Sequence, residues 1–129
     1  MKLLLDTDIA LWAAEGASQL SPTAVALIED PQNTLYVSAA SIWEITIKYR
    51  NGNLPVHPRD ARSAFRLAGF DELPISSDHV EAVAALPDFA DHADPFDRVM
   101  VAQALHEGMP LVSADPKVRR YHATLMLRA

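Results

Sequence analysis

Lys2-Leu3-Leu4-Leu5-Asp6 is an apolar run of strand length that stops at a carboxylate. Four later stretches have the length and composition of strands, and they occupy residues 35–38, 72–75, 111–113 and 124–127. Between them the sequence predicts helices over residues 8–14, 22–30, 41–50, 58–69, 78–86 and 96–107, and a short helix after residue 116. Short strands that alternate with helices predict an α/β fold around a mostly parallel sheet of about four to five strands.

Composition limits both the architecture and the chemistry. The chain has 129 residues, 50% of them hydrophobic, which predicts one domain over residues 1–129. No apolar run approaches the roughly 20 residues of a membrane span or forms a signal peptide, so we expect a soluble, cytoplasmic protein. The lack of cysteine excludes disulfides, thiolate metal sites and cysteine nucleophiles. A net charge of −6 argues against nucleic-acid binding over the whole surface, but it allows a local site around bound cations.

Acidic residues in apolar surroundings are the main functional signal. Asp6 ends the first predicted strand, Glu44 lies inside an apolar helix, and Asp97 opens another. Ligands bind beyond the carboxyl ends of parallel strands, so Asp115, which follows the strand at residues 111–113, is a fourth candidate for the same crevice. Buried carboxylates need a positive partner, and without cysteine the simplest partner is a hard divalent cation.

Each of these acids also has a purely structural explanation. Asp97 has the position of a first-turn acid in a helix that Asp94 caps, although the other residues on its helical face are apolar. Glu44 is spaced to form an ion pair with Lys48 on an exposed helix face. The two acids that follow strands are placed to cap the next helix. The coincidence of all four acids, more than any one of them, indicates a site.

Four motifs give the sequence a resemblance to the PIN-domain ribonucleases, specifically to the VapC-like toxins of bacterial toxin–antitoxin pairs. The resemblance runs nearly end to end, and the motifs occur in the family's order and spacing. They are Leu4-Leu5-Asp6-Thr7-Asp8, Val37-Ser38-Ala39-Ala40-Ser41-Ile42-Trp43-Glu44-Ile45, His92-Ala93-Asp94-Pro95-Phe96-Asp97-Arg98 and Leu111-Val112-Ser113-Ala114-Asp115. The resemblance implies a PIN-like three-layer α/β/α fold and a metal-dependent endoribonuclease.

The resemblance also implies a site and partners. Asp6 and Asp97 would ligate the principal Mg²⁺ or Mn²⁺ ion, while Glu44 and Asp115 would bind through water, complete a second site or orient the nucleophile. RNA cleavage would leave a 3′-hydroxyl and a 5′-phosphate. The implied partners are RNA, a VapB-like antitoxin whose C-terminal segment lies in the groove, and a second copy of the chain, as a homodimer or as a heterotetramer or larger assembly with the antitoxin. Supporting roles are expected for Thr7, Ser113, Asp94 and Arg98.

Two positions depart from the family pattern. Asp8 stands where close relatives usually have His, and it either adds charge near the metal or caps a helix. Ser113 stands where many relatives have Thr, and it retains the hydroxyl group.

Three other residues carry weaker indications. Arg98 is placed to contact an RNA phosphate or to pair with Asp94 or Glu44. His92 lies in a predicted loop, and we interpret it as a surface histidine rather than a participant in proton transfer. We assign Trp43 to packing, in the core or at an interface, rather than to base stacking.

Two other functions remain open on the sequence alone. Leu5-Asp6-Thr7-Asp8 also resembles the motif of haloacid-dehalogenase-like phosphatases, in which Asp6 would be a covalent nucleophile and Asp8 its acid/base partner. That interpretation needs a lysine, for which Lys117 is the candidate, and it leaves Glu44 unexplained. The second alternative is a non-catalytic binding module with the same fold, which the presence of all four acids opposes.

Overall fold

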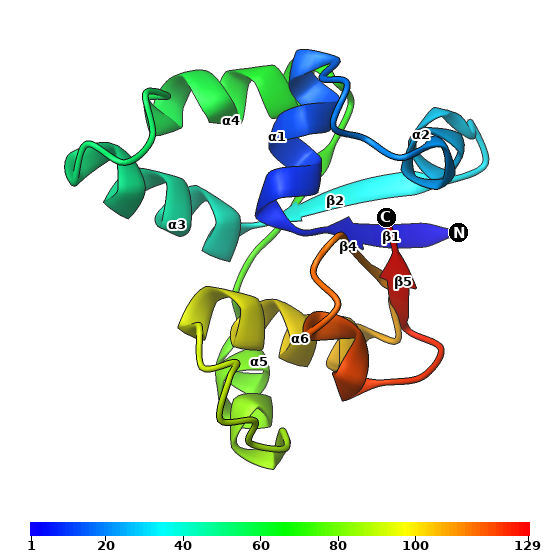
Figure 1. Ribbon diagram of the computed structural model, residues 1–129, viewed down its shortest axis with the longest axis vertical. Coiled ribbons are helices and arrows are strands. Elements are labelled where there is room, and N and C mark those ends of the chain that lie inside the picture. The colour runs from blue at the N-terminus through cyan, green and yellow to red at the C-terminus, as the bar shows by residue number, and fades with distance from the viewer.

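A five-stranded sheet forms the centre of the computed structural model, which describes residues 1–129 (Figure 1). Every strand pair is parallel, and the strand order is β3-β2-β1-β4-β5. The strands are β1 (Lys2–Leu5), β2 (Thr34–Ser38), β3 (Asp71–Leu73), β4 (Leu111–Ser113) and β5 (Met126–Arg128). The predicted α/β fold around a parallel sheet is therefore confirmed.

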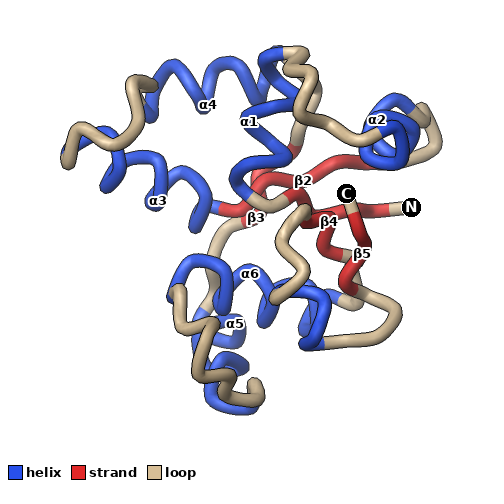
Figure 2. Tube along the Cα trace, in the orientation of Figure 1, coloured by secondary structure: helices blue, strands red, loops and turns tan.

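Helices cover both faces of this sheet (Figures 1 and 2). The helices are α1 (Thr7–Glu15), α2 (Pro22–Glu29), α3 (Ala39–Arg50), α4 (Pro58–Leu67), α5 (Ser77–Ala82) and α6 (Pro95–Glu107), with the 3-10 turns η1 (Val83–Ala85) and η2 (Val118–Tyr121). In the view of Figure 1, α1, α2 and α4 lie above the sheet, α3 extends to the left from the end of β2, and α5, α6 and η2 lie below the sheet. None of these helices combines the length and the apolar character that crossing a membrane requires.

The leucine run of β1 connects the two helical layers. Leu3, Leu4 and Leu5 are fully buried because β1 is the central strand and both of its faces are covered. Leu3 and Leu5 belong to the same cluster as Phe65 of α4, whereas Leu4 belongs to the cluster that contains Met100 of α6. Alternate side chains of a strand point to opposite faces, so one short segment contributes to both halves of the core.

Two predicted helix boundaries are wrong for reasons that the structure shows, and the helix expected over residues 58–69 ends at Leu67. The helix expected from residue 41 begins at Ala39, because the hydroxyl of Ser38 accepts a hydrogen bond from the N–H of Ala40 and caps α3 directly at the end of β2. The helix expected over residues 78–86 ends at Ala82 and continues only as η1. Leu86 precedes a proline and is extended, which does not allow a further α-helical turn.

The sheet topology creates a crevice beside β1. The chain leaves β1 for β2 on one side and later returns to β4 on the other side, so the carboxyl ends of β1 and β4 flank a point where the direction of winding reverses. Open parallel sheets bind ligands at such points. Asp6 follows β1 and Asp115 follows β4 by two residues, so both lie at this edge.

Candidate active site

A polar cavity of about 180 Å³ opens at the carboxyl edge of the sheet. None of its eight lining residues is hydrophobic, and six are acidic. The lining residues are Asp6, Thr7, Asp8, Glu44, Lys48, Asp94, Asp97 and Asp115. All four acids that the sequence singles out thus meet at one cavity, together with the expected supporting residues Thr7 and Asp94.

Asp6 connects the end of β1 to the start of α1. Its Oδ1 accepts a hydrogen bond from the N–H of Ile9 at 3.0 Å, so it caps α1 as well as lining the cavity. The pKa of Asp6 is raised to about 7, mainly by burial and also by the charges of Asp8 and Asp97, although hydrogen bonds from the Ser113 hydroxyl and the Ile9 N–H act to lower it. The cavity therefore holds a carboxyl group that is costly to ionise without added positive charge.

Glu44 is only 7% exposed on α3. Its Oε1 accepts a hydrogen bond from the Thr7 hydroxyl at 2.6 Å, and its Oε2 lies 2.7 Å from Nζ of Lys48. The Oγ atom of Ser41 lies 2.9 Å from that of Thr7. The ion pair with Lys48 that the sequence offers as an alternative does exist, but it forms part of the cavity wall instead of an exposed helix face.

Asp97 lies in the first turn of α6 and reaches the same cavity. Asp94 is the residue that caps this helix, because its Oδ1 accepts hydrogen bonds from the N–H groups of Phe96 at 2.9 Å and Asp97 at 3.0 Å. Burial raises the pKa of Asp97 to about 6, and the negative charges of Asp94 and Glu44 contribute, while His92 lowers it. Asp97 therefore resembles Asp6 in lacking a compensating cation.

Asp115 completes the cavity beyond β4. Its Oδ1 accepts a hydrogen bond from the N–H of Lys117 at 2.9 Å, so it also caps a turn. The fully buried hydroxyl of Ser113 accepts a hydrogen bond from the N–H of Asp115 at 3.1 Å. The potential ligand atoms of Asp115, Asp97 and His92 all lie within 4.8 Å of one another.

His92 is buried at 5% exposure, so its interpretation as a surface histidine is wrong. Its Nε2 lies 3.3 Å from Oδ2 of Asp97, and its Nδ1 lies 2.8 Å from the hydroxyl of Tyr121. The loop folds back on itself, because the N–H of His92 donates to the carbonyl of Phe89 at 3.1 Å. His92 is the first residue of the motif that contains Asp94 and Asp97, and this position could have identified it as a residue of the site. No motif in the sequence identifies Tyr121 in the same way.

Arg98 points away from the acidic cavity. Its guanidinium donates hydrogen bonds to the Tyr121 hydroxyl at 3.1 Å and to the Asp88 carboxylate at 3.2 Å. The suggested pairing of Arg98 with Asp94 or Glu44 is therefore wrong.

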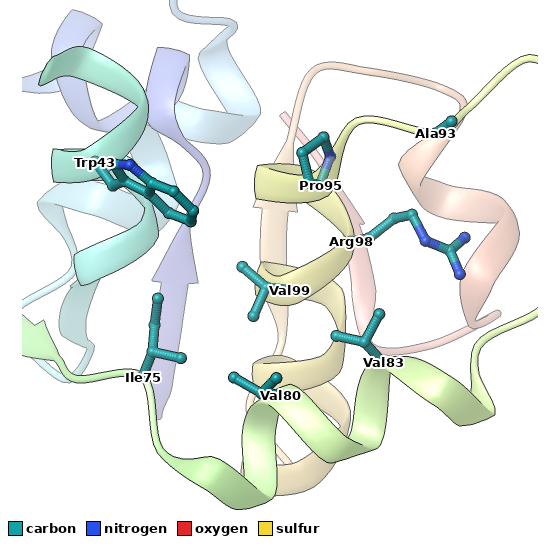
Figure 3. A pocket seen from close by; sticks show the side chains of 8 residues that line it. All are labelled: Trp43, Ile75, Val80, Val83, Ala93, Pro95, Arg98 and Val99. Atoms are coloured by element: carbon teal, nitrogen blue, oxygen red, sulfur yellow. The ribbon is translucent and has the colours of Figure 1, made fainter. Parts of the chain in front are cut away.

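A separate apolar depression of about 380 Å³ lies between α3, α5 and α6 (Figure 3). It is lined by Trp43, Ile75, Val80, Val83, Ala93, Pro95, Arg98 and Val99. The Trp43 side chain packs edge-on against Phe96 with ring centroids 4.9 Å apart, yet Trp43 remains 56% exposed. Trp43 is therefore not a core residue, and the apolar face of α3 that carries it is open to solvent.

The donor set of the acidic cavity fits a hard divalent cation. Carboxylate and hydroxyl oxygens line the cavity, and these are the ligands that Mg²⁺ and Mn²⁺ prefer. Lys48 is the one basic residue among six acids, and the pKa values of Asp6 and Asp97 are raised mainly by burial, with further contributions from neighbouring negative charges. A divalent cation bound by these two carboxylates would supply the missing positive charge.

A second group of potential metal ligands consists of His79, His106 and Glu107. Nδ1 of His79 accepts a hydrogen bond from the N–H of Ser76 at 3.0 Å, which places the ring proton on Nε2. Nε2 lies 2.8 Å from a carboxylate oxygen of Glu107 and donates to it. Because neither nitrogen of His79 offers a free lone pair, this group stabilises the start of α5 and is a poor metal site.

The family model of the PIN domain matches residues 3–123 of this chain. Ribonuclease VapC16 from Mycobacterium tuberculosis is 39% identical to it over 57 residues, an alignment that covers 42% of this chain and 39% of the relative. The chain thus matches well under half the length of that ribonuclease.

Solved structures share the fold over almost the whole chain. VapBC2 from Rickettsia felis, bound to a DNA fragment from its promoter, has a TM-score of 0.65 at 16% identity, covering 100% of this chain and 98% of its own. FitAcB from Neisseria gonorrhoeae has a TM-score of 0.61 at 18% identity, with coverage of 100% and 97%. VapC20 from Mycobacterium tuberculosis, a toxin that cleaves the sarcin-ricin loop, has a TM-score of 0.59 at 18% identity, with coverage of 96% of both chains.

Proposed function

This chain belongs to the PIN-domain family, and from that membership we propose that it is a metal-dependent endoribonuclease of the VapC type. The observation that carries the proposal is the meeting of Asp6, Glu44, Asp97 and Asp115 in one polar cavity. Local similarity to a VapC ribonuclease supports RNA as the substrate. The reaction would be hydrolysis of a phosphodiester bond that leaves a 3′-hydroxyl and a 5′-phosphate.

Asp6 and Asp97 would hold the cation, Mg²⁺ or Mn²⁺. When bound, the cation would activate a water molecule and stabilise the charge that develops on the phosphate and the leaving oxygen. The chain contributes preorganisation, because one oxygen of each of three aspartates already has a protein donor. Oδ1 of Asp6 accepts from Ile9, Oδ2 of Asp97 lies beside His92, and Oδ1 of Asp115 accepts from the following turn.

Glu44 and Lys48 would act on the substrate side of the site. Both oxygens of Glu44 already have partners, which suits a role in orienting water rather than direct ligation. The hydrogen bond to Glu44 raises the pKa of Lys48, so its ammonium group stays charged. This ammonium is the only positive side-chain charge at the cavity wall, and it is placed to attract an RNA phosphate.

We also propose a cognate antitoxin and a homodimer as partners. The structural neighbours include VapBC2 and a toxin–antitoxin complex from Klebsiella pneumoniae, which supports regulation by a protein partner. A basic side chain of the antitoxin would find six acids in the cavity. The exposed Trp43 and the apolar depression beside it offer contact area for assembly.

Neither alternative function gains support from the structure. Membership of the PIN-domain family provides no basis for a haloacid-dehalogenase-like phosphatase, and the position of Glu44 in the cavity has no role in that chemistry. A non-catalytic binding module does not require six acids with one lysine at the same cavity. RNA cleavage is therefore the property that separates a nuclease from a binding module.

Incubation of the purified, antitoxin-free protein with mixed cellular RNA tests the proposal. The reactions would contain Mg²⁺, Mn²⁺ or EDTA, and the fragment ends would be sequenced. We expect discrete, metal-dependent cuts that Asp6→Asn abolishes and that Asp78→Asn, on exposed α5 surface, retains. Absence of cleavage by the wild-type protein with both metals would favour the binding module.

A further inference from the structure

A line of hydrogen bonds runs from the surface to the acidic cavity through four side chains. Arg98 Nη1 lies 3.1 Å from the Tyr121 hydroxyl, this hydroxyl lies 2.8 Å from His92 Nδ1, and His92 Nε2 lies 3.3 Å from Oδ2 of Asp97. His92 and Tyr121 are both buried, so these contacts are shielded from water. The last member of the line is one of the two acids proposed to hold the cation.

The Arg98 donor sets one end of this line, and the need of each buried polar hydrogen for an acceptor sets the direction of the rest. A guanidinium can only donate, so the oxygen of Tyr121 accepts from Arg98. The hydroxyl proton of Tyr121 then has one acceptor within reach, the Nδ1 atom of His92. Nδ1 therefore carries a lone pair, and the ring proton is on Nε2, which faces Asp97.

We propose that Tyr121, oriented by Arg98, is a positioning residue that holds His92 as the Nε2–H tautomer and thereby fixes the Asp97 carboxylate for the divalent cation. The proposal rests on the proposed function for its metal, but the direction of the hydrogen bonds does not. It gives Arg98 a role through Tyr121 in place of a contact with RNA.

His92 itself is excluded as a metal ligand by the same geometry. Its Nε2 is close enough to Asp97 and Asp115 to suggest a three-residue metal site. Ligation through Nε2 would move the ring proton to Nδ1 and leave the Tyr121 hydroxyl proton without an acceptor in a buried position. His92 therefore donates to a ligand instead of being one.

The surrounding residues hold this line in place. The Phe89 ring packs edge-on against Tyr121 with centroids 5.0 Å apart, and the guanidinium of Arg120 lies 4.2 Å from the centroid of Phe89. Arg120 also pairs with Asp91 at 2.8 Å, next to His92 in the chain. The loop that carries His92 is thus attached on both sides to the segment that carries Tyr121.

Nitrogen NMR of the histidine rings tests the tautomer directly. We expect long-range proton–nitrogen correlations at pH 8 to show His92 as a single neutral Nε2–H tautomer, and we expect Tyr121→Phe, which removes only a hydroxyl, to produce a mixture of tautomers. Tyr36→Phe is the matched control, because the Tyr36 hydroxyl forms no hydrogen bond with another residue. A Nδ1–H tautomer or a doubly protonated ring in the wild-type protein would overturn the proposal.

Calorimetric titration with Mn²⁺ tests the consequence for Asp97. Loss of an outer partner of a metal ligand typically weakens metal binding or activity by about 10- to 100-fold, so we expect a Kd at least about tenfold higher for Tyr121→Phe than for Tyr36→Phe. RNA cleavage should lose kcat with KM unchanged. Equal Mn²⁺ affinities in the two variants would overturn the positioning role. Failure of the wild-type protein to bind Mn²⁺ would contradict the proposed metal-dependent function. The direction of the hydrogen bonds would then be tested by the NMR measurement of the His92 tautomer alone.

Discussion

The hydroxyl of Thr7 lies 2.6 Å from Oε1 of Glu44, 37 residues further along the chain. This hydrogen bond joins the first residue of α1 to the middle of α3, so the end of β1 and the wall of the cavity are fixed relative to each other. Lys48 holds the other oxygen of the same carboxylate. Both carboxylate oxygens of Glu44 are thus held by other side chains of the cavity wall.

Replacement of Thr7 by Val tests this constraint. Thr7→Val keeps the side-chain shape but removes a buried hydrogen bond to a charged group, which should cost about 1.5–3 kcal/mol of the free energy of unfolding. We expect RNA cleavage to fall about tenfold, as for other partners of site carboxylates. Thr46→Val is the control, because the Thr46 hydroxyl donates only to the Ile42 carbonyl in its own helix. Equal cleavage by both variants would contradict a role for this contact.

Removal of the cavity's lysine should have opposite effects on metal and on RNA. Lys48→Gln takes away the only cation at the cavity wall, so the remaining acids should bind Mn²⁺ about three- to tenfold more tightly at low ionic strength. RNA affinity should fall because a phosphate loses its attraction. Calorimetry and filter binding measure the two effects, with Lys2→Gln on β1 as the charge-matched control. Weaker Mn²⁺ binding by Lys48→Gln would contradict the electrostatic account.

The stability of the metal-free protein should depend on the ionisation of Asp6. Burial raises the pKa of Asp6 from 3.8 to about 7, so the folded protein retains a proton that the unfolded chain releases. The stability that this proton provides is complete below about pH 4 and is lost as the pH rises to about 7, a change of roughly 2–4 kcal/mol.

Urea denaturation in EDTA between pH 4 and pH 7.5 measures this dependence. Asp6→Asn keeps an oxygen that can cap α1 and cannot ionise, so its stability relative to wild type should increase over the interval. Asp78→Asn, at an exposed position, should show no such trend. If the stabilities of Asp6→Asn and wild type changed in parallel with pH, the raised pKa of Asp6 in the folded protein would be refuted.

The exposed Trp43 provides a test of assembly. Trp43→Ser removes the contact with Phe96, and since Trp43 is 56% exposed we expect the free energy of unfolding to change by no more than about 1.5 kcal/mol. The larger effect should be on the oligomer, which light scattering over a range of concentrations would show as a shift from dimer to monomer. Wild-type protein that stays monomeric, or a Trp43→Ser variant that stays dimeric, would contradict the proposed interface.

Local sequence signals predicted most of the fold. Strand-length apolar runs and the caps at Ser21, Asp94 and Gly108 place β1, β4, α2 and α6 within a residue or two of their observed bounds. The strand expected at residues 124–127 is displaced to Met126–Arg128, and the strand expected at 72–75 is Asp71–Leu73. Both are three-residue edge strands, whose limits depend on pairing with a neighbour and not on their own composition.

The acids of the site could be predicted because each stands out against apolar neighbours, but their partners could not. Asp6 and Asp115 each cap a helix or turn, which the sequence can indicate. Contacts of His92 with Tyr121 join residues 29 positions apart, and no local pattern links them. Tertiary packing alone turns His92 from an expected surface residue into a buried donor.

Cleavage of one defined RNA at increasing Mn²⁺ concentrations, by wild type, Asp97→Asn and Asp78→Asn, tests the central claim most directly. The RNA would carry a cut site identified in the mixed pool. We predict saturable, Mn²⁺-dependent cleavage by wild type and Asp78→Asn, and a loss for Asp97→Asn that exceeds the roughly 10- to 100-fold typical of an outer partner. Equal rates for wild type and Asp97→Asn, or cleavage that persists in EDTA, would contradict the assignment of the acidic cavity as a metal-dependent ribonuclease site.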